Sequence, residues 1–473
     1  MKRDVVNEIS GVIDVFSERA KAFVRDVESR NTYPELKALK NLQQFNIVLQ
    51  EDPINPQSVL KELDAIGSPA TVLNTGARYF GFVIGGTLPA ALGANLLAGV
   101  WDQNAGLEPT SPISAHLEMV CRKWLNTLLQ LPPETEVGFV TGATMANFTA
   151  LAAARHSVLL REGWNVEEDG LFAAPPITVV ISEEAHVSLF KALSHLGLGK
   201  NRVVRVPCDN QGRMRPDLFP KIKGPAIVCI QAGNIHSGAF DPADEICDMA
   251  HAFDAWVHVD GAFGLWALAV PEKAHLTRGL EKADSWATDA HKWLNTPYDS
   301  GLAFVRDAGA LTASMTQNAS YLIQDGSRDP FVYVPEMSRK ARGIEIWSAL
   351  RSLGKNGLTE MIRSSCELAG VIAEKLRDSG FQVLNDVVLN QVLVSFGDDD
   401  LNKRIIKRIQ EEGTCWLGGS SWHNKTIMRI SISSWRTTRE DIDLCANIIA
   451  GIARDEILKS ASNLKLQTSN LKP

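Results

Sequence analysis

The apolar positions of the chain repeat with two different periods. Near the N-terminus, Val5, Ile9, Ile13 and Phe16 recur at helical spacing on one side of a segment. Further along, short apolar runs near residues 137, 177, 202, 226, 256 and 284 are separated by helical stretches. Apolar strands that alternate with helices are typical of a parallel sheet covered on both faces. The pattern therefore predicts an α/β fold with a mostly parallel central sheet.

The same pattern divides the chain into four parts. We expect a helical arm over residues 1–70, a large α/β domain over 71–350, and a small α+β domain over 351–457 around the short β runs QVLVSF and IMRISIS. Residues 458–473 are expected to form a flexible tail. Within the large domain, the polar segment 316–334 is predicted to be a mobile loop.

Polar residues follow several of the predicted strands directly. Thr144, His186, Asn234, Asp260 and Lys292 each come just after an apolar run. Parallel sheets bind their ligands at the carboxyl ends of the strands. We therefore expect these five side chains to lie at one edge of the sheet.

Composition narrows the classes of function. The chain of 473 residues is 45% hydrophobic and 22% charged, as soluble globular proteins are, and its net charge of −7 comes without a long basic run. Nucleic acid and anionic membrane surfaces are therefore excluded as main partners. The seven cysteines are scattered without a C-x-x-C pair, which favours free thiols over a disulfide framework or a metal site. With no apolar run of bilayer length and no secretory signal, the cytoplasm is the expected location.

Lys292 and Asp260 form the most informative pair. Lys292 stands between His291 and Trp293 at the exit of a buried run, and desolvation there would favour the neutral, nucleophilic amine. Asp260 ends a neighbouring run and could pair with a protonated ring nitrogen. A lysine that forms a Schiff base and an acid opposite the pyridinium are what pyridoxal phosphate requires.

The Asp-x-Ala motif at 260–262, followed by His-Lys-Trp at 291–293, resembles the group II pyridoxal-dependent amino-acid decarboxylases. This family includes the aromatic amino-acid, histidine and glutamate decarboxylases and has fold type I of the aspartate-aminotransferase superfamily. The resemblance extends from about residue 56 to 452. It implies a lyase of amino-acid metabolism that binds pyridoxal 5'-phosphate and forms a homodimer, with each active site built from both chains.

The resemblance also implies roles for individual residues around the cofactor ring. Lys292 would hold the cofactor as an internal aldimine, and Asp260 would keep its ring nitrogen protonated. His186 would stack on one face of the ring and Ala262 would touch the other face. Asn234 stands where many relatives have a threonine near the cofactor hydroxyl.

A phosphate site is expected where the run at 137 turns into an alanine-rich helix. Small residues at a helix N-terminus leave amide groups free to bind phosphate, and the helix dipole assists. The resemblance implies that Ala143, Thr144 and His291 bind the cofactor phosphate.

The substrate side is less defined by the sequence. The resemblance implies contributions from Tyr79, Phe80, Gln103, Asn104 and Arg429. The aromatic residues would suit an aromatic amino acid, whereas the amides and the arginine would suit a polar or acidic one. Gly85 and Gly86 would let the backbone approach a ligand closely.

The expected reaction is decarboxylation of an L-amino acid to the amine and CO2. A loop tyrosine would return the proton to Cα, and Tyr333 is the first candidate, with Tyr321 the second. Phe331 lies close to the expected place, and a phenylalanine there accompanies aldehyde-forming oxidative chemistry in some relatives. Three competing functions stay open at this point: a carbon–carbon lyase, an aminotransferase and a non-catalytic cofactor-binding homologue.

Overall fold

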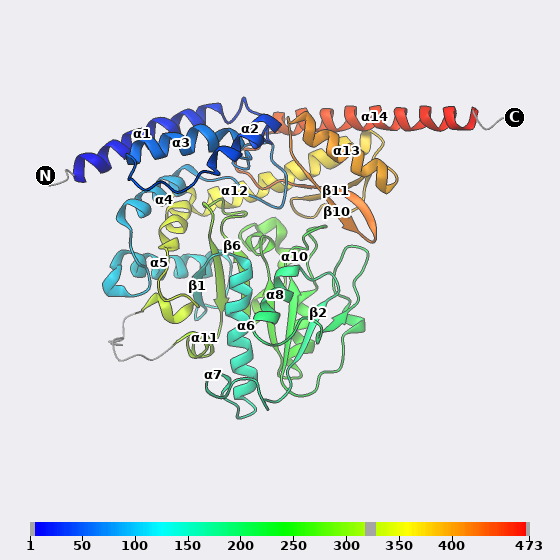
Figure 1. Cartoon of the computed structure of the whole chain (residues 1–473). Helices are drawn as coiled ribbons and strands as arrows, with labels where there is room; N and C mark the ends of the chain where they lie inside the picture. Colours follow the sequence, from blue (N-terminus) through cyan, green and yellow to red (C-terminus); the bar gives the residue numbers. More distant parts are fainter. Residues whose placement is uncertain (1–4, 317–327, 470–473) are drawn as a thin grey trace.

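A seven-stranded sheet forms the centre of the large domain (Figure 1). The computed structural model describes residues 5–316 and 328–469. The strands follow the order β1-β7-β6-β5-β4-β2-β3, and only β7 runs antiparallel to its neighbours. Their bounds are β1 Glu136–Val140, β2 Thr178–Ser182, β3 Val204–Val206, β4 Ala226–Gln231, β5 Trp256–Asp260, β6 Ser285–Asp289 and β7 Gly301–Val305. The predicted mostly parallel sheet is confirmed.

Helices cover both faces of this sheet, as expected for strands that are buried throughout. In β4, Ile227 and Cys229 pack in one hydrophobic cluster, whereas Val228 and Ile230 pack in another. The first face carries α6 (Ala143–Leu160), α8 (Val187–His195) and α11 (Ala308–Met315), and the second carries α5 (Pro112–Leu128) and α9 (Ala243–His251). Burial on both faces explains why the strands are continuous apolar runs.

The small domain is built on an antiparallel sheet in the order β10-β11-β9-β8. Its strands are β8 Gln382–Val383, β9 Gln391–Ser395, β10 Gly418–Trp422 and β11 Lys425–Ser431, and its helices include α13 Asp399–Glu412. The helix α12 (Arg342–Asp378) joins the two domains and bends at Gly354, whose φ is 61°. The predicted domain boundary at residue 350 falls inside this helix, close to the bend.

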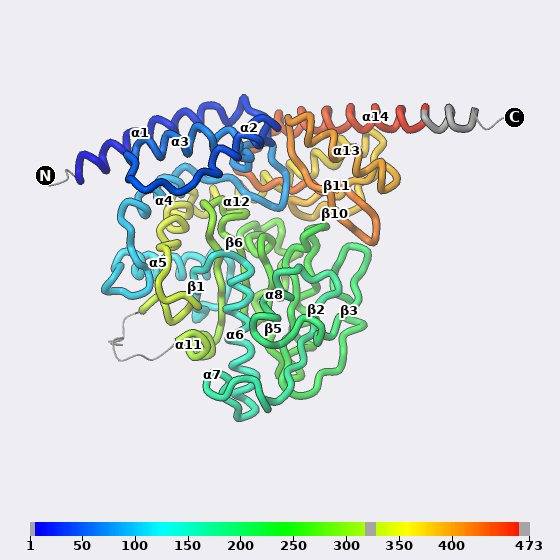
Figure 2. The backbone as a smooth tube through the Cα atoms, in the orientation of Figure 1, coloured from blue at the N-terminus to red at the C-terminus, as the bar shows by residue number. Residues whose placement is uncertain are grey.

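The N-terminal arm lies along the top of the molecule in Figure 1. It contains α1 (Val5–Asp26), α2 (Leu36–Asn41) and α3 (Pro56–Gly67), and Arg19 of α1 forms an ion pair with Asp64 of α3 at 2.8 Å. The helix α4 (Pro89–Trp101) follows and packs against α12. The helix α1 and the C-terminal helix lie on opposite sides of the molecule (Figure 2).

The C-terminal helix extends into the segment that the sequence analysis predicts to be a tail. The last helix, α14 (Arg439–Ser469), continues through residues 458–469. The sequence contains neither glycine nor proline between Ala453 and Ser469, so no residue stops the helix there. Among the described residues, no helix is both long enough and apolar enough to cross a bilayer.

Candidate active site

One pocket at the carboxyl edge of the sheet brings together Lys292, Asp260 and His186. Gln231 pairs with Asp260 across β4 and β5, and Asp260 pairs with Ala287 across β5 and β6, so the three strand ends are adjacent. The pocket is completed by Gln231, Gly233, Ile235, Ala262 and Phe263. The three residues come from segments far apart in the sequence and meet because parallel strands end at the same edge of the sheet.

The backbone of Lys292 is held in place by the segment before α4. A Cβ atom on Gly85 would lie 1.9 Å from the Lys292 carbonyl oxygen, so this position admits only glycine. The amide of Gly86 donates to Asn295 Oδ1 at 2.7 Å. The Gly85–Gly86 pair thus approaches the backbone that carries the lysine, where the sequence suggested an approach to a ligand.

Lys292 has an acidic partner that sequence reasoning missed. Its Nζ lies 2.9 Å from Asp289 Oδ2, at the end of β6. Asp289 Oδ1 accepts a hydrogen bond from the Ala143 amide and lies 3.3 Å from His291 Nε2. The expected desolvated lysine is therefore ion-paired, because an acid three residues earlier in the chain faces it.

Asp260 is buried, with 5% of its surface exposed. Burial raises the pKa of its carboxyl, and the nearby His186, Lys292 and Asn147 act in the opposite direction. Asp260 Oδ2 accepts from Asn147 Nδ2 at 3.2 Å, and Oδ1 accepts from the Ala262 amide at 3.3 Å. Both carboxylate oxygens therefore face donors.

His186 caps the N-terminus of α8. Its Nδ1 accepts from the Ser188 amide at 3.3 Å and lies 2.7 Å from Ser188 Oγ. Burial is the main cause that lowers the pKa of His186, so the neutral ring is favoured. The capping bonds fix the plane of a ring that lines the pocket.

Around the N-terminus of α6, Ala143 is buried and Thr144 is exposed. His291 Nδ1 accepts from the Ser300 amide at 3.0 Å, which leaves its Nε2 to carry the proton towards Asp289. The ring of Tyr298 stacks on His291 with centroids 4.2 Å apart. Burial chiefly lowers the pKa of His291.

Two amides lie near the end of β4. Asn234, the predicted contact for the cofactor hydroxyl, accepts from the His236 and Ser237 amides in a tight turn and does not line the pocket. Gln231 does line the pocket, and its buried Nε2 has no hydrogen-bond partner among the described residues. An unpaired buried donor that faces a pocket is suited to a ligand acceptor. Gln231 is therefore a candidate that no sequence motif singles out.

Aromatic side chains gather near Tyr79. Its ring stacks on Trp416 with centroids 5.0 Å apart, and Phe82 stacks on the same tryptophan at 5.4 Å. Burial raises the pKa of Tyr79 to about 12. Trp416 was not predicted, because it lies in the small domain more than 300 residues away in sequence.

Arg429 has an environment suited to an anionic ligand. Its Nη1 donates to the carbonyl of Ile235, a pocket residue, at 3.2 Å. Within the described residues, no acidic group acts on the charge of this guanidinium. Burial lowers the pKa of Arg429 to about 10. A partly buried guanidinium without an acidic partner favours binding of a carboxylate.

None of the five predicted substrate residues lines the Lys292 pocket of its own chain, and three of them have other contacts that occupy their side chains. Phe80 is only 1% exposed and packs in the core of the small domain, so its assignment to the pocket wall is corrected: burial in this core explains its apolar character. Gln103 donates to the carbonyl of Trp101. Asn104 accepts from the Gly106 and Arg339 amides and so stabilises a turn.

Tyr333, the first candidate for the proton donor, does not line this pocket either. Tyr333 ends a short 3-10 helix (Pro330–Tyr333), and the guanidinium of Arg328 lies 4.1 Å above its ring. Phe331 is buried beside it. Tyr321 lies outside the described residues.

The comparisons with known proteins agree on one family. A family model described as the pyridoxal-dependent decarboxylase conserved domain matches residues 40–397, more than half of the chain. The chain belongs to the pyridoxal-dependent decarboxylase family. It is therefore a pyridoxal-phosphate-dependent carboxy-lyase, and its cofactor is pyridoxal 5'-phosphate.

Individual relatives show how far the likeness of this decarboxylase extends. It is 26% identical to tryptophan decarboxylase 1 of Oryza sativa subsp. japonica, covering 91% of this chain and 90% of that protein. It is 29% identical to L-tyrosine/L-DOPA decarboxylase 2 of Lophophora williamsii, covering 73% and 72%. The crystal structure of Oryza sativa TDC with PLP and tryptamine superposes with a TM-score of 0.85 at 23% identity, covering 96% and 98%. This likeness confirms the predicted fold type I.

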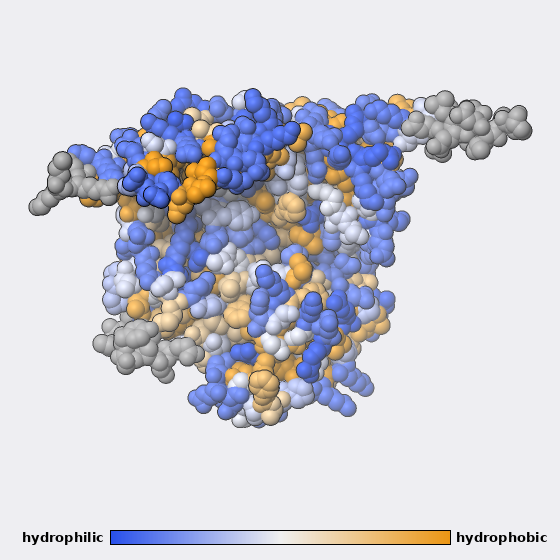
Figure 3. All heavy atoms as spheres, in the orientation of Figure 1, coloured by the Kyte–Doolittle hydropathy of each residue, from blue (hydrophilic) through white to orange (hydrophobic). Residues whose placement is uncertain are grey.

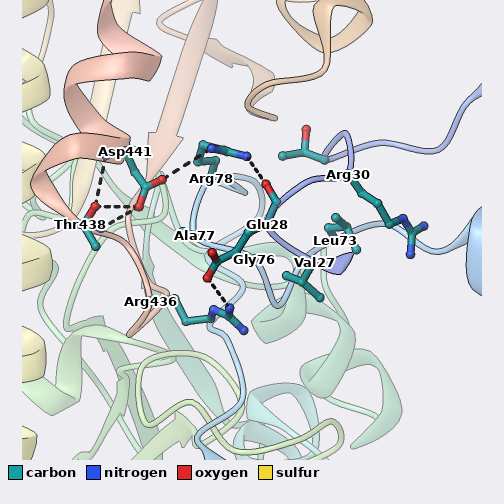
Figure 4. Close-up of a pocket in the computed structure, with 11 residues that line it drawn as sticks. Val27, Glu28, Arg30, Leu73, Gly76, Ala77, Arg78, Arg436, Thr438 and Asp441 are labelled. Carbon is teal, nitrogen blue, oxygen red and sulfur yellow. Dashed lines mark hydrogen bonds and ion pairs between the residues drawn. The ribbon is translucent and has the colours of Figure 1, made fainter. Parts of the chain in front are cut away.

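A second cavity of the decarboxylase lies between the arm and the small domain (Figure 4). There Arg436 pairs with Glu28 at 3.0 Å, and Arg78 donates to the Glu28 carbonyl at 3.1 Å and lies 3.8 Å from Asp441. Each of these charges has a protein partner. The contacts that line this cavity therefore connect the arm to the small domain. The cavity is separate from the Lys292 pocket.

Proposed function

We propose that the protein decarboxylates an L-amino acid to the amine and CO2, with the cofactor held on Lys292. The observation that carries this proposal is the meeting of Lys292, Asp260 and His186 in one pocket at the carboxyl edge of the sheet. The family already supplies the general reaction, and the proposal assigns it to these residues.

The residues of the pocket match the functional groups of the cofactor. Pyridoxal phosphate, when bound, acts as an electron sink for bonds at the substrate Cα. Lys292 supplies the amine for its aldehyde, and Asp260 supplies a buried anion for its ring nitrogen. His186, neutral and fixed by Ser188, offers a flat face to the ring, and Ala262 is small enough to leave room on the other side.

The N-terminus of α6 is the proposed phosphate site. The Ala143 amide, the exposed Thr144 and the positive end of the helix dipole favour an anion there. His291 adds a proton on Nε2 at the same place. Asn234 stays a proposed cofactor contact, with Gln231 as the alternative donor from the same strand end.

Arg429 is proposed to bind the substrate carboxylate, and Tyr79 is proposed to contact the substrate side chain. Three stacked rings, from Tyr79, Trp416 and Phe82, support an aromatic substrate, as do the names of the relatives, which include tryptophan and tyrosine decarboxylases. An aromatic L-amino acid is therefore the first substrate class to test.

We also propose a homodimer. The described part of the arm exposes many large apolar side chains, and hydrophobic residues gather along the lower edge of the arm in Figure 3. The most exposed are Val6, Ile9, Leu36, Ile47, Val48 and Leu49. Apolar patches of this kind mark interfaces, and a second copy would bring Gln103, Asn104 and Tyr333 to a site shared between chains. The free state of all seven cysteines supports a reducing compartment such as the cytoplasm.

A substrate screen tests the reaction. The purified protein, loaded with pyridoxal phosphate, would be given each of the twenty amino acids, with CO2 release and product mass measured together. We expect an amine from at least one aromatic amino acid and no CO2 from the Lys292→Ala variant. If the protein instead forms an aldehyde and consumes oxygen, the reaction is oxidative decarboxylation. If it forms a keto acid and releases no CO2, the reaction is transamination.

A further inference from the structure

A chain of buried polar groups runs from Asp260 into the interior of the large domain. Asn147 of α6 donates from Nδ2 to Asp260 Oδ2 at 3.2 Å, and its Oδ1 lies 2.8 Å from His258 Nε2. On the other side of the ring, His258 Nδ1 lies 2.9 Å from Ser285 Oγ. The indole Nε1 of Trp256 donates to the same hydroxyl at 2.8 Å. All five residues are buried, and none of them leaves a buried polar side-chain atom unpaired.

The direction of every bond in this chain follows from its two ends. An indole can only donate, so Ser285 Oγ accepts from Trp256. The Ser285 hydroxyl then donates to His258 Nδ1, and the proton of the neutral ring lies on Nε2. His258 Nε2 donates to Asn147 Oδ1, which turns the amide nitrogen of Asn147 towards Asp260.

The reversed arrangement is less favourable. If Asn147 presented its oxygen to Asp260, the carboxyl would have to be protonated and His258 would carry its proton on Nδ1. Ser285 would then accept two hydrogen bonds, and its own hydrogen would have no acceptor among the described residues. A buried hydroxyl without an acceptor is unfavourable. Burial also lowers the pKa of His258 to about 3, so the ring is neutral, as the first arrangement requires.

We propose that Asn147 and His258, with Ser285 and Trp256 behind them, are positioning residues that hold Asp260 as an ionised carboxylate towards the cofactor ring nitrogen. The inference rests on the role proposed above for Asp260. The chain of donors compensates for the burial that otherwise favours a neutral acid. His258 lies two residues before Asp260 on β5, so both side chains point to the same face of the sheet, where α6 supplies Asn147.

The experiment measures the protonation of the cofactor ring nitrogen, which is independent of turnover. Enzyme loaded with pyridoxal phosphate labelled with 15N in the ring would be studied by solid-state NMR, where the 15N shift reports the ring proton. We expect a protonated nitrogen in the wild type. In Asn147→Leu and His258→Phe, the ratio of protonated to neutral nitrogen should fall by about tenfold, as for loss of one hydrogen bond to a charged group. Ser285→Ala, which removes one oxygen at the far end, should give a smaller shift in the same direction.

Two matched controls separate positioning from packing. Asn126→Leu removes a buried asparagine of α5 that bonds the Thr135 carbonyl, and His156→Phe removes a buried histidine of α6 that pairs with Glu167. Both should lower the melting temperature and leave the 15N shift unchanged.

Two outcomes would overturn the positioning role. It is refuted if Asn147→Leu, His258→Phe and Ser285→Ala keep the wild-type shift while Asp260→Asn changes it. If Asp260→Asn itself keeps that shift, the role proposed for Asp260 fails, and the positioning role of its neighbours fails with it.

Discussion

Asp289 Oδ2 lies 2.9 Å from Lys292 Nζ, so the lysine proposed to hold the cofactor is ion-paired with the acid three residues before it. The other oxygen of the same carboxylate accepts the Ala143 amide at the N-terminus of α6. A carboxylate therefore occupies part of the anion site proposed for the cofactor phosphate. The carboxylate of Asp289 and a phosphate bound at this helix N-terminus would repel each other, because both are negatively charged and the site is partly buried.

This geometry predicts that Asp289→Asn strengthens binding of the phosphate. Pyridoxamine 5'-phosphate is the appropriate probe, because it has no aldehyde to react with Lys292. Removing one negative charge should lower its Kd by roughly tenfold, measured by fluorescence titration. Pyridoxamine without the phosphate is the control and should bind both proteins equally. Weaker binding of the phosphorylated probe by the variant would contradict the repulsion.

The central pair of the site could be predicted from the sequence, and the reason is topological. Lys292 and Asp260 stand at the ends of parallel strands, and such ends meet at one edge whatever the exact register. His186 was predictable on the same ground. The strand pattern was sufficient to place all three at one edge of the sheet, whereas their roles came from the family resemblance.

The supporting residues could not be predicted, because their roles depend on contacts between distant segments. Asn147 and His258 are 111 positions apart, and nothing in either segment indicates that they are hydrogen-bonded. Trp416 belongs to the small domain, so its stacking on Tyr79 depends on how the domains pack. Phe80 was misassigned for the same reason: an aromatic residue beside glycines resembles a pocket wall until its burial is known.

Arg429 provides a test of substrate binding. If its guanidinium binds the substrate carboxylate, Arg429→Met should raise KM for the amino acid by about 10- to 100-fold, as expected for loss of a charge-assisted hydrogen bond. Arg429→Lys should recover only part of this, because an ammonium cannot form the bidentate pair. The affinity for pyridoxal phosphate should stay the same. Arg436→Met, which removes an arginine of the second cavity, is the control and should leave KM unchanged. An unchanged KM in Arg429→Met would exclude the contact between Arg429 and the substrate carboxylate.

The proposed dimer predicts that charged side chains placed on the exposed apolar surface of the arm weaken dimer formation. Val6 and Ile9 are 78% and 56% exposed in the single chain, so Val6→Glu with Ile9→Lys should leave the fold of one chain intact. If a second copy covers them, the variant should dissociate at concentrations where the wild type is a dimer, and activity should fall with dissociation. Sedimentation velocity over a dilution series measures this. Phe172→Glu, at a side chain 94% exposed outside the arm, should have no effect.

Removing residues 1–50 should weaken the dimer further, since most of the exposed apolar side chains of the arm are lost with them. The truncated protein is expected to lose activity and dimer stability together. A fully active monomer at nanomolar concentration would show that neither the arm nor a second copy is needed for catalysis.

The last prediction concerns the proton that returns to Cα after CO2 leaves. Tyr333 lies under Arg328 in its own chain and does not line the Lys292 pocket, so we expect it to act as the acid at a site shared with a second copy. Tyr333→Phe should then lower the amine yield and divert part of the product to aldehyde, ammonia and peroxide, because an unprotonated intermediate is exposed to oxygen for longer.

Mixed dimers give the decisive measurement. A Tyr333→Phe chain paired with a Lys292→Ala chain places the phenylalanine and the working lysine in either the same site or different sites. If the tyrosine acts across the interface, the one site that keeps Lys292 receives its loop from the Lys292→Ala chain, whose Tyr333 is intact, and the wild-type product ratio should return. If aldehyde persists in this mixed dimer, the tyrosine acts within its own chain. An unchanged product ratio in the Tyr333→Phe homodimer would transfer the role to Tyr321, for which Tyr321→Phe is the corresponding variant.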